Sequence, residues 1–167
     1  MRSFDKVSLG LFPTPLYRLD NLSRMFGTNI WVKHDDLCGV ALGASIYMPD
    51  TRVVCPMVDT DPFDRIVPDL MHQAAALLET DAALQPPELL DLCGPGYSIP
   101  SPEGNEAIAL MLRHEGIVLD TCYTGKAFAG LLRHVREGRY SGKNHILFIH
   151  TGGAGGLFAQ DWDHMSL

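Results

Sequence analysis

The chain has 167 residues, of which 46% are apolar and 20% charged, with a mean hydropathy of +0.04. This length and composition predict one globular domain that buries a core without disulfide or metal cross-links. A net charge of −7 and a pI of about 5.4 argue against a nucleic-acid partner held by phosphate contacts. We find no run of about 18 apolar residues and no signal-peptide pattern, so we expect no membrane partner and a cytoplasmic location.

The four cysteines, Cys38, Cys55, Cys93 and Cys122, are scattered singly, without the C-x-x-C spacing of redox or zinc motifs. We therefore expect reduced thiols rather than a disulfide framework.

The first elements are short. Proline favours an extended arm over residues 12–19, and residues 21–27 predict a short helical turn that ends at Gly27. Residues 29–35 and 51–58 are rich in β-forming side chains and predict strands.

Residues 33–50, "KHDDLCGVALGASIYMPD", predict a loop with a glycine turn and no helix after it. His34, Asp35, Asp36 and Cys38 could suggest a metal site, but their spacing matches no established zinc pattern. We expect instead that an aspartate of this loop hydrogen-bonds nearby backbone N–H groups, and we assign no metal ligands.

Three helices are predicted in the second part of the chain. The first spans 61–80, with Asp61 as cap and Pro62 in the first helical position. After a proline- and glycine-rich loop around a short apolar strand, Ser101 caps a helix that ends at Gly116. Thr124 is the expected cap of the third helix.

Strands are predicted over residues 117–123 and 144–150, the second followed by the glycine loop "TGGAGG". Strands that alternate with helices predict an α/β fold with a mostly parallel sheet flanked by helices. Ligands of such sheets bind beyond the carboxyl ends of the strands. The residues at these ends are Tyr123, Thr124, Thr151 and Gly152.

Two motifs allow more than one interpretation. The glycines of "HTGGAGG" suit either a tight turn or a backbone site for an anion. In "YTGKA", Lys126 stands in the first turn of a helix, where its charge opposes the helix dipole. It is therefore expected to reach into solvent or to face an anion. A serine-hydrolase elbow, G-x-S-x-G, is absent from the sequence.

Four stretches together resemble one family: "FPTPLYRLDNLS", "WVKHDDLCGVALG", "GPGYSIPSPEGNEAIALMLRHEGIVLDTCYTGKAFAGLL" and "HILFIHTGGAGGLFA". They are similar to the pyridoxal-phosphate enzymes that include D-cysteine desulfhydrase and 1-aminocyclopropane-1-carboxylate (ACC) deaminase. The resemblance covers roughly residues 10–44 and 85–160 and is looser over 51–84. "YTGKA" and "HTGG" look closer to the desulfhydrase.

The resemblance implies a shortened large domain of the tryptophan-synthase-β type (fold type II). The family's chains are about twice this length, and their "LALG" continues into the lysine that forms the Schiff base. Here "GVALG" is followed by "ASIYMP", and Lys33 and Lys126 match other lysines of the family. The expected organisation is one α/β domain, with an arm and loop over 1–44 and a βα part over 51–167. The small cofactor domain and the phosphate loop are missing.

The resemblance also implies residue roles. Tyr97 and Tyr123 are the expected catalytic residues, near the cofactor ring and the substrate. Thr151, near the pyridine nitrogen, is an expected cofactor-binding residue together with Gly152 and Thr124.

Three functional readings remain open. The first is a lyase or deaminase of a small amino acid such as D-cysteine, with pyridoxal phosphate as cofactor. The second is a non-catalytic remnant that serves as a binding module and forms a homodimer through apolar surface exposed by the shortening. The third is lysine-independent chemistry with Tyr97, Tyr123 or Cys122 as the acid–base group.

Overall fold

The computed structural model of the chain describes residues 16–34, 40–140 and 145–157. The elements follow in the order β1 (Leu16–Arg18), α1 (Asp20–Phe26), β2 (Asn29–His34), α2 (Val40–Tyr47), β3 (Val54–Met57), α3 (Phe63–Leu77), β4 (Glu88–Asp91), α4 (Pro102–Glu115), α5 (Thr124–Arg136), β5 (His145–His150) and α6 (Ala154–Leu157). The predicted aspartate contacts of residues 35–36 lie outside the described residues.

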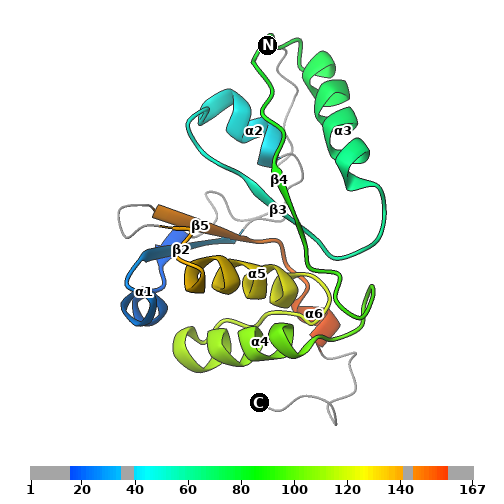
Figure 1. Ribbon diagram of the computed structural model, residues 1–167. Helices are drawn as coiled ribbons and strands as arrows, with labels where there is room; N and C mark the ends of the chain where they lie inside the picture. Colours follow the sequence, from blue (N-terminus) through cyan, green and yellow to red (C-terminus); the bar gives the residue numbers. More distant parts are fainter. Residues whose placement is uncertain (1–15, 35–39, 141–144, 158–167) are drawn as a thin grey trace.

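The described strands form two sheets. β2 is the central strand of the order β1-β2-β5, antiparallel to β1 and parallel to β5. β3 and β4 form a separate parallel pair. Figure 1 shows this pair with α2 and α3 on one side of the molecule, and the three-stranded sheet with α1, α4 and α5 on the other. The predicted α/β class with mostly parallel pairing is confirmed.

The main core lies between the three-stranded sheet and α1, α4 and α5. The rings of Phe128 in α5 and Phe148 in β5 meet edge to face, with centroids 5.2 Å apart. Burial of each large apolar side chain contributes about 1.5–3 kcal/mol, so this cluster fixes α5 on the sheet. Its buried members are Leu19, Leu22, Ile30, Val32, Ala107, Ile108, Met111, Ile117, Leu119, Phe128, Leu132 and Phe148.

α2 is a helix where the sequence predicted none. Leu42 packs with Met71 and Ala75 of α3 in a second apolar cluster. The prediction was wrong because "ALGASIY" has few strong helix signals of its own, and tertiary packing supplies the stability that intrinsic propensity does not.

Three of the predicted helix ends are confirmed. The Ser101 hydroxyl accepts the capping hydrogen bond at the start of α4, and Gly27 and Gly116 end α1 and α4 in the left-handed conformation. The start of α3 differs by one residue, because Pro62 is the N-cap residue and the Asp61 side chain makes no capping bond.

Residues 117–123 form no strand, although the sequence predicted one. Residues 117–120 have no regular secondary structure, the chain turns at residues 121–123, and α5 begins at Thr124 with Tyr123 as its N-cap residue. In the described ranges, no helix is long and apolar enough to cross a membrane, and no group of three His, Cys, Asp or Glu side chains could hold a metal ion.

Candidate functional site

Two tyrosines from different segments lie together near the start of α5. The hydroxyl groups of Tyr97 and Tyr123 share a hydrogen bond, and their rings meet edge to face with centroids 6.0 Å apart. The two side chains remain 49% and 46% exposed. The structure therefore brings together the two predicted catalytic residues as a pair that a ligand can reach.

The contact between the two tyrosines favours the protonated form of Tyr123. The hydrogen bond to Tyr97, followed by burial, raises the pKa of Tyr123 to about 12. At neutral pH this tyrosine keeps its proton, so the pair can donate a hydrogen bond or a proton to a ligand. A phenolate that acts as a general base is disfavoured.

The Asp120 carboxylate holds Tyr123 in place. It accepts hydrogen bonds from the backbone N–H groups of Cys122, Tyr123 and Thr124, at 2.7–2.8 Å, and from the Thr124 hydroxyl. Asp120 is only 2% exposed. Charge-assisted bonds of this kind are strong, and a carboxylate also suits the positive end of the helix dipole. The turn that carries Tyr123 is therefore built around Asp120.

Lys126 holds the segment that carries Tyr97. Its side chain is 1% exposed, and its ammonium group donates to the backbone oxygens of Cys93, at 2.7 Å, and Gly96, at 2.8 Å. The sequence predicted that this lysine would either reach into solvent or face an anion, and both predictions are wrong. Its charge faces inward to a turn of the backbone.

The carboxyl end of β5 reaches the same Asp120. A Cβ atom added to Gly153, which has φ +90°, would lie 2.5 Å from a carboxylate oxygen of Asp120. The preceding His150 is buried, and its Nδ1 accepts from the N–H of Gly152 while Nε2 donates to the Val118 oxygen. These bonds correspond to the neutral ring and fix the backbone just before the glycine loop.

The predicted cofactor-binding residues differ in exposure. Thr151 is exposed and Gly152 is partly exposed. Thr124 is buried, and its hydroxyl donates to the Asp120 carboxylate and accepts from the Asp120 N–H. The roles of these three residues stay predictions.

The described residues fit only part of pyridoxal phosphate. The two half-exposed phenols suit a planar, polar ring. The start of α5 does not suit the phosphate, because the Asp120 carboxylate already takes its first N–H groups. The amine of Lys126 does not suit covalent attachment, because it is buried and hydrogen-bonded. We therefore derive no reaction step through the cofactor.

Sequence reasoning missed Asp120 and misread Lys126. The aspartate lies four residues before Thr124, a spacing that could have suggested a carboxylate that accepts hydrogen bonds at the start of a helix. This role was not predicted because residues 117–123 were expected to form a strand. No local signal indicates that the loop of residues 93–96 folds over Lys126, because the two segments are distant in sequence.

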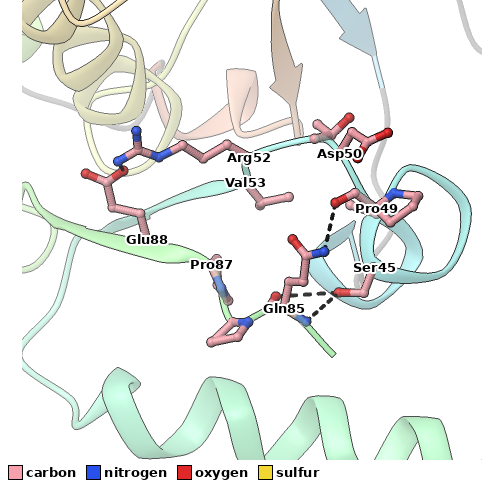
Figure 2. Close-up of a pocket in the computed structure, with 11 residues that line it drawn as sticks. Ser45, Pro49, Asp50, Arg52, Val53, Gln85, Pro87 and Glu88 are labelled. Carbon is pink, nitrogen blue, oxygen red and sulfur yellow. Dashed lines mark hydrogen bonds and ion pairs between the residues drawn. The ribbon is translucent and has the colours of Figure 1, made fainter. Parts of the chain in front are cut away.

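Away from the tyrosine pair, a cavity of about 370 Å³ lies at the amino ends of β3 and β4 (Figure 2). The Ser45 hydroxyl accepts from the Gln85 N–H at 3.0 Å, and the Gln85 side chain donates to the Pro49 oxygen at 2.8 Å. Arg52 pairs with Glu88 beside them. These polar groups bind one another and join α2 to β4, at the end of the strands opposite to the one that parallel sheets use for ligands.

The comparisons with known proteins show the family of the chain. Residues 36–152 match the model of a family described as "Pyridoxal-phosphate dependent enzyme". The chain is also similar to a solved structure titled "Crystal Structure Analysis of the ACC deaminase homologue", with 34% sequence identity and a TM-score of 0.63. The alignment covers 74% of this chain and 40% of that one, so the chain spans less than half of this relative's length. This chain belongs to the pyridoxal-phosphate-dependent enzymes, as a shortened member with fold type II.

Proposed function

We propose that the chain is a member of the group of D-cysteine desulfhydrase and ACC deaminase in which covalent attachment of pyridoxal phosphate is impaired. Members of this group are lyases and deaminases of small amino acids, and we assign this chain to the cytoplasm with them. The main support for impaired attachment is the position of the Lys126 amine, which is buried and donates to two backbone oxygens.

The other lysines add to this argument. The sequence has only four, Lys6, Lys33, Lys126 and Lys143. Lys126 is the one whose side chain falls within the described residues, and no lysine follows "GVALG" as it does in the family. The cofactor becomes an electron sink for substrate carbon only when its aldehyde carries the substrate amine. Without a lysine to hold it and a loop to bind its phosphate, we expect weak and reversible binding at the tyrosine pair.

The experiment is a cofactor titration of the purified chain. We expect no stoichiometric Schiff-base absorbance with pyridoxal phosphate, and no sulfide from D-cysteine or ammonia from ACC. Borohydride reduction and peptide mapping then locate any adduct, and Lys126→Met is the control for reaction of other lysines. A stoichiometric adduct on one lysine, or turnover of either amino acid, would overturn the proposal.

A specific surface favours a second candidate, a module that associates with a second copy of itself. An open groove of about 730 Å³ runs along α4. Along it, Glu106 stands one turn before the central pair, Ala109 and Leu110, and Arg113 stands one turn after it. Two copies of α4 packed antiparallel about this centre would bring Glu106 of each copy next to Arg113 of the other.

The charge pattern is therefore complementary to itself, which is the reason to name a second copy as the occupant. Glu106 also pairs with Arg136 of its own chain, but both side chains are about half exposed. An exposed pair of this kind contributes about 0–1 kcal/mol and does not exclude a second arginine. One helix pair is a small interface, so we expect a weak dimer that depends on concentration.

A further inference from the structure

The turn that carries Tyr97 has an unfavourable backbone. Gly94 and Gly96 have φ of 62° and 150°, and Ser98, which has a Cβ atom, has φ of 60°. Such conformations cost about 1–3 kcal/mol each for residues with side chains, and glycines leave the backbone free to adopt many others. The turn is therefore not fixed by its own conformational preferences.

Packing holds only the start of the turn, where Cys93 is buried. The Tyr97 side chain is 49% exposed, and the next apolar side chain, Ile99, is 50% exposed. From the protein interior, Lys126 donates two hydrogen bonds to this turn, to the oxygens of Cys93 and Gly96. Lys126 in turn stands one helical turn after Tyr123 on α5.

We propose that Lys126 is a positioning residue for Tyr97: its ammonium group fixes the turn of residues 93–96 so that the Tyr97 hydroxyl meets the Tyr123 hydroxyl. One end of α5 then supplies both halves of the arrangement, Tyr123 directly and Tyr97 through the lysine. A buried ammonium group is costly, and an apolar side chain of similar volume would pack as well. What the lysine adds is two directed bonds to one turn. The inference rests on the proposed role of the tyrosine pair as the ligand-facing site.

The test measures the ionisation of Tyr123 in protein without added cofactor. Carbon-13 labelling of the tyrosine ring carbon that bears oxygen lets NMR follow each tyrosine separately through a pH titration. In the unmodified protein the Tyr123 midpoint is expected near 12. Tyr97→Phe removes the shared hydrogen bond and lowers this midpoint by about one pH unit or more. Lys126→Met is expected to lower it by a similar amount.

The double variant Lys126→Met with Tyr97→Phe separates positioning from general loosening. If Lys126 acts through Tyr97, the double variant has the same Tyr123 midpoint as Tyr97→Phe alone. Additive shifts, or an unchanged midpoint in Lys126→Met, would overturn the proposal. Tyr140 at the far end of α5 serves as the internal reference, because its ionisation should not change in any variant.

A second measurement on the unmodified protein keeps the proposal testable if Lys126→Met does not fold. Brief labelling with an amine reagent, followed by peptide mapping, should leave Lys126 unmodified in the native state and modify it after unfolding. Rapid native labelling would contradict the burial and bonding on which the inference depends. Since neither measurement uses cofactor, their outcome is independent of the pyridoxal phosphate titration.

Discussion

Asp120 occupies the position at the start of α5 where a bound anion could otherwise lie. Its carboxylate takes the N–H groups of three successive residues, and β5 reaches it through the backbone of Gly153. The same residue thus sets the orientation of Tyr123 and the path of the loop after β5. The geometry of the candidate site depends on one buried aspartate more than on any of the residues that the family resemblance suggested.

A single methyl group at Gly153 tests this contact. In Gly153→Ala the new Cβ atom would lie 2.5 Å from the Asp120 carboxylate, and φ +90° is unfavourable for alanine. We expect a loss of about 2–4 kcal/mol in the free energy of unfolding, measured with urea. Gly138→Ala is the matched control, since Gly138 has φ +70° and its added Cβ meets nothing within 4 Å, so it should cost only the backbone strain, about 1 kcal/mol. Equal effects of the two substitutions would mean that the contact with Asp120 is unimportant.

Polar groups fasten the other end of α5 to the start of β4. The buried His134 ring contacts the Tyr140 hydroxyl through Nδ1, at 3.0 Å, and Arg139 through Nε2, at 2.7 Å. Arg139 continues to Glu88, which also pairs with Arg52 before β3. α5 therefore links the two sheets, with the tyrosine pair at its beginning and this network at its end.

This network predicts a dependence of stability on pH. Burial lowers the pKa of His134 below its usual value of 6.5, so the folded protein binds fewer protons than the unfolded chain just below that pH. The contribution of His134 to the free energy of unfolding is complete above pH 6.5 and is lost as the pH falls from there through the lowered pKa. The pKa of Glu88 is lowered, chiefly by its hydrogen bond to Arg139, so its contribution is lost in a separate range below 4.5.

Urea unfolding at a series of pH values from 7.5 down to 5 measures the contribution of His134. The free energy of unfolding should fall across this range, and His134→Gln should flatten the fall. The exposed His72 is the control, because His72→Gln should leave the slope unchanged. A slope that survives in His134→Gln would assign the effect to other groups.

The elements that the sequence predicted well are those with local signals. Ser101 and the glycines after α1 and α4 define helix ends through their own side chains and dihedral angles. α2 and the turn at residues 121–123 were missed because packing on α3 and the Asp120 carboxylate determine them, and these are contacts between residues that no local pattern connects. Contacts between distant residues also explain why the candidate site was predicted only in part. Tyr97 and Tyr123 were found by resemblance, whereas the inward course of Lys126 depends on a loop some thirty residues earlier.

At the scale of the molecule, the chain keeps the core of a larger enzyme fold and leaves apolar side chains on its surface. Large apolar residues that are at least about half exposed include Met25, Tyr47, Met48, Leu70, Leu77 and Ile99. The match to the solved ACC deaminase homologue covers 40% of that longer chain, so most of the relative has no counterpart here. The groove along α4 is the part of this surface whose charges point to a specific partner, a second copy of the chain.

Charge reversal tests this association. Sedimentation velocity should show a dimer at high concentration, and Glu106→Arg or Arg113→Glu should each weaken it by placing like charges together. An equal mixture of the two variants should dimerise again, because both contacts then pair opposite charges. Asp69→Arg and Arg65→Glu on α3 make the same charge changes at exposed positions and should have no effect. A monomer at every concentration, or no recovery in the mixture, would exclude the α4 interface.

The pairing of β2 with β5 has a consequence for biosynthesis. These strands join residues 29–34 to residues 145–150, so the main sheet closes over nearly the whole length of the described chain. Contacts between residues so distant in sequence form slowly, because a long loop must be closed before any bond is gained. On the ribosome, the edge of β2 that pairs with β5 stays unpaired until β5 emerges. While the residues between β2 and β5 are synthesised, the apolar residues of this sheet are therefore open to chaperones and to other nascent chains.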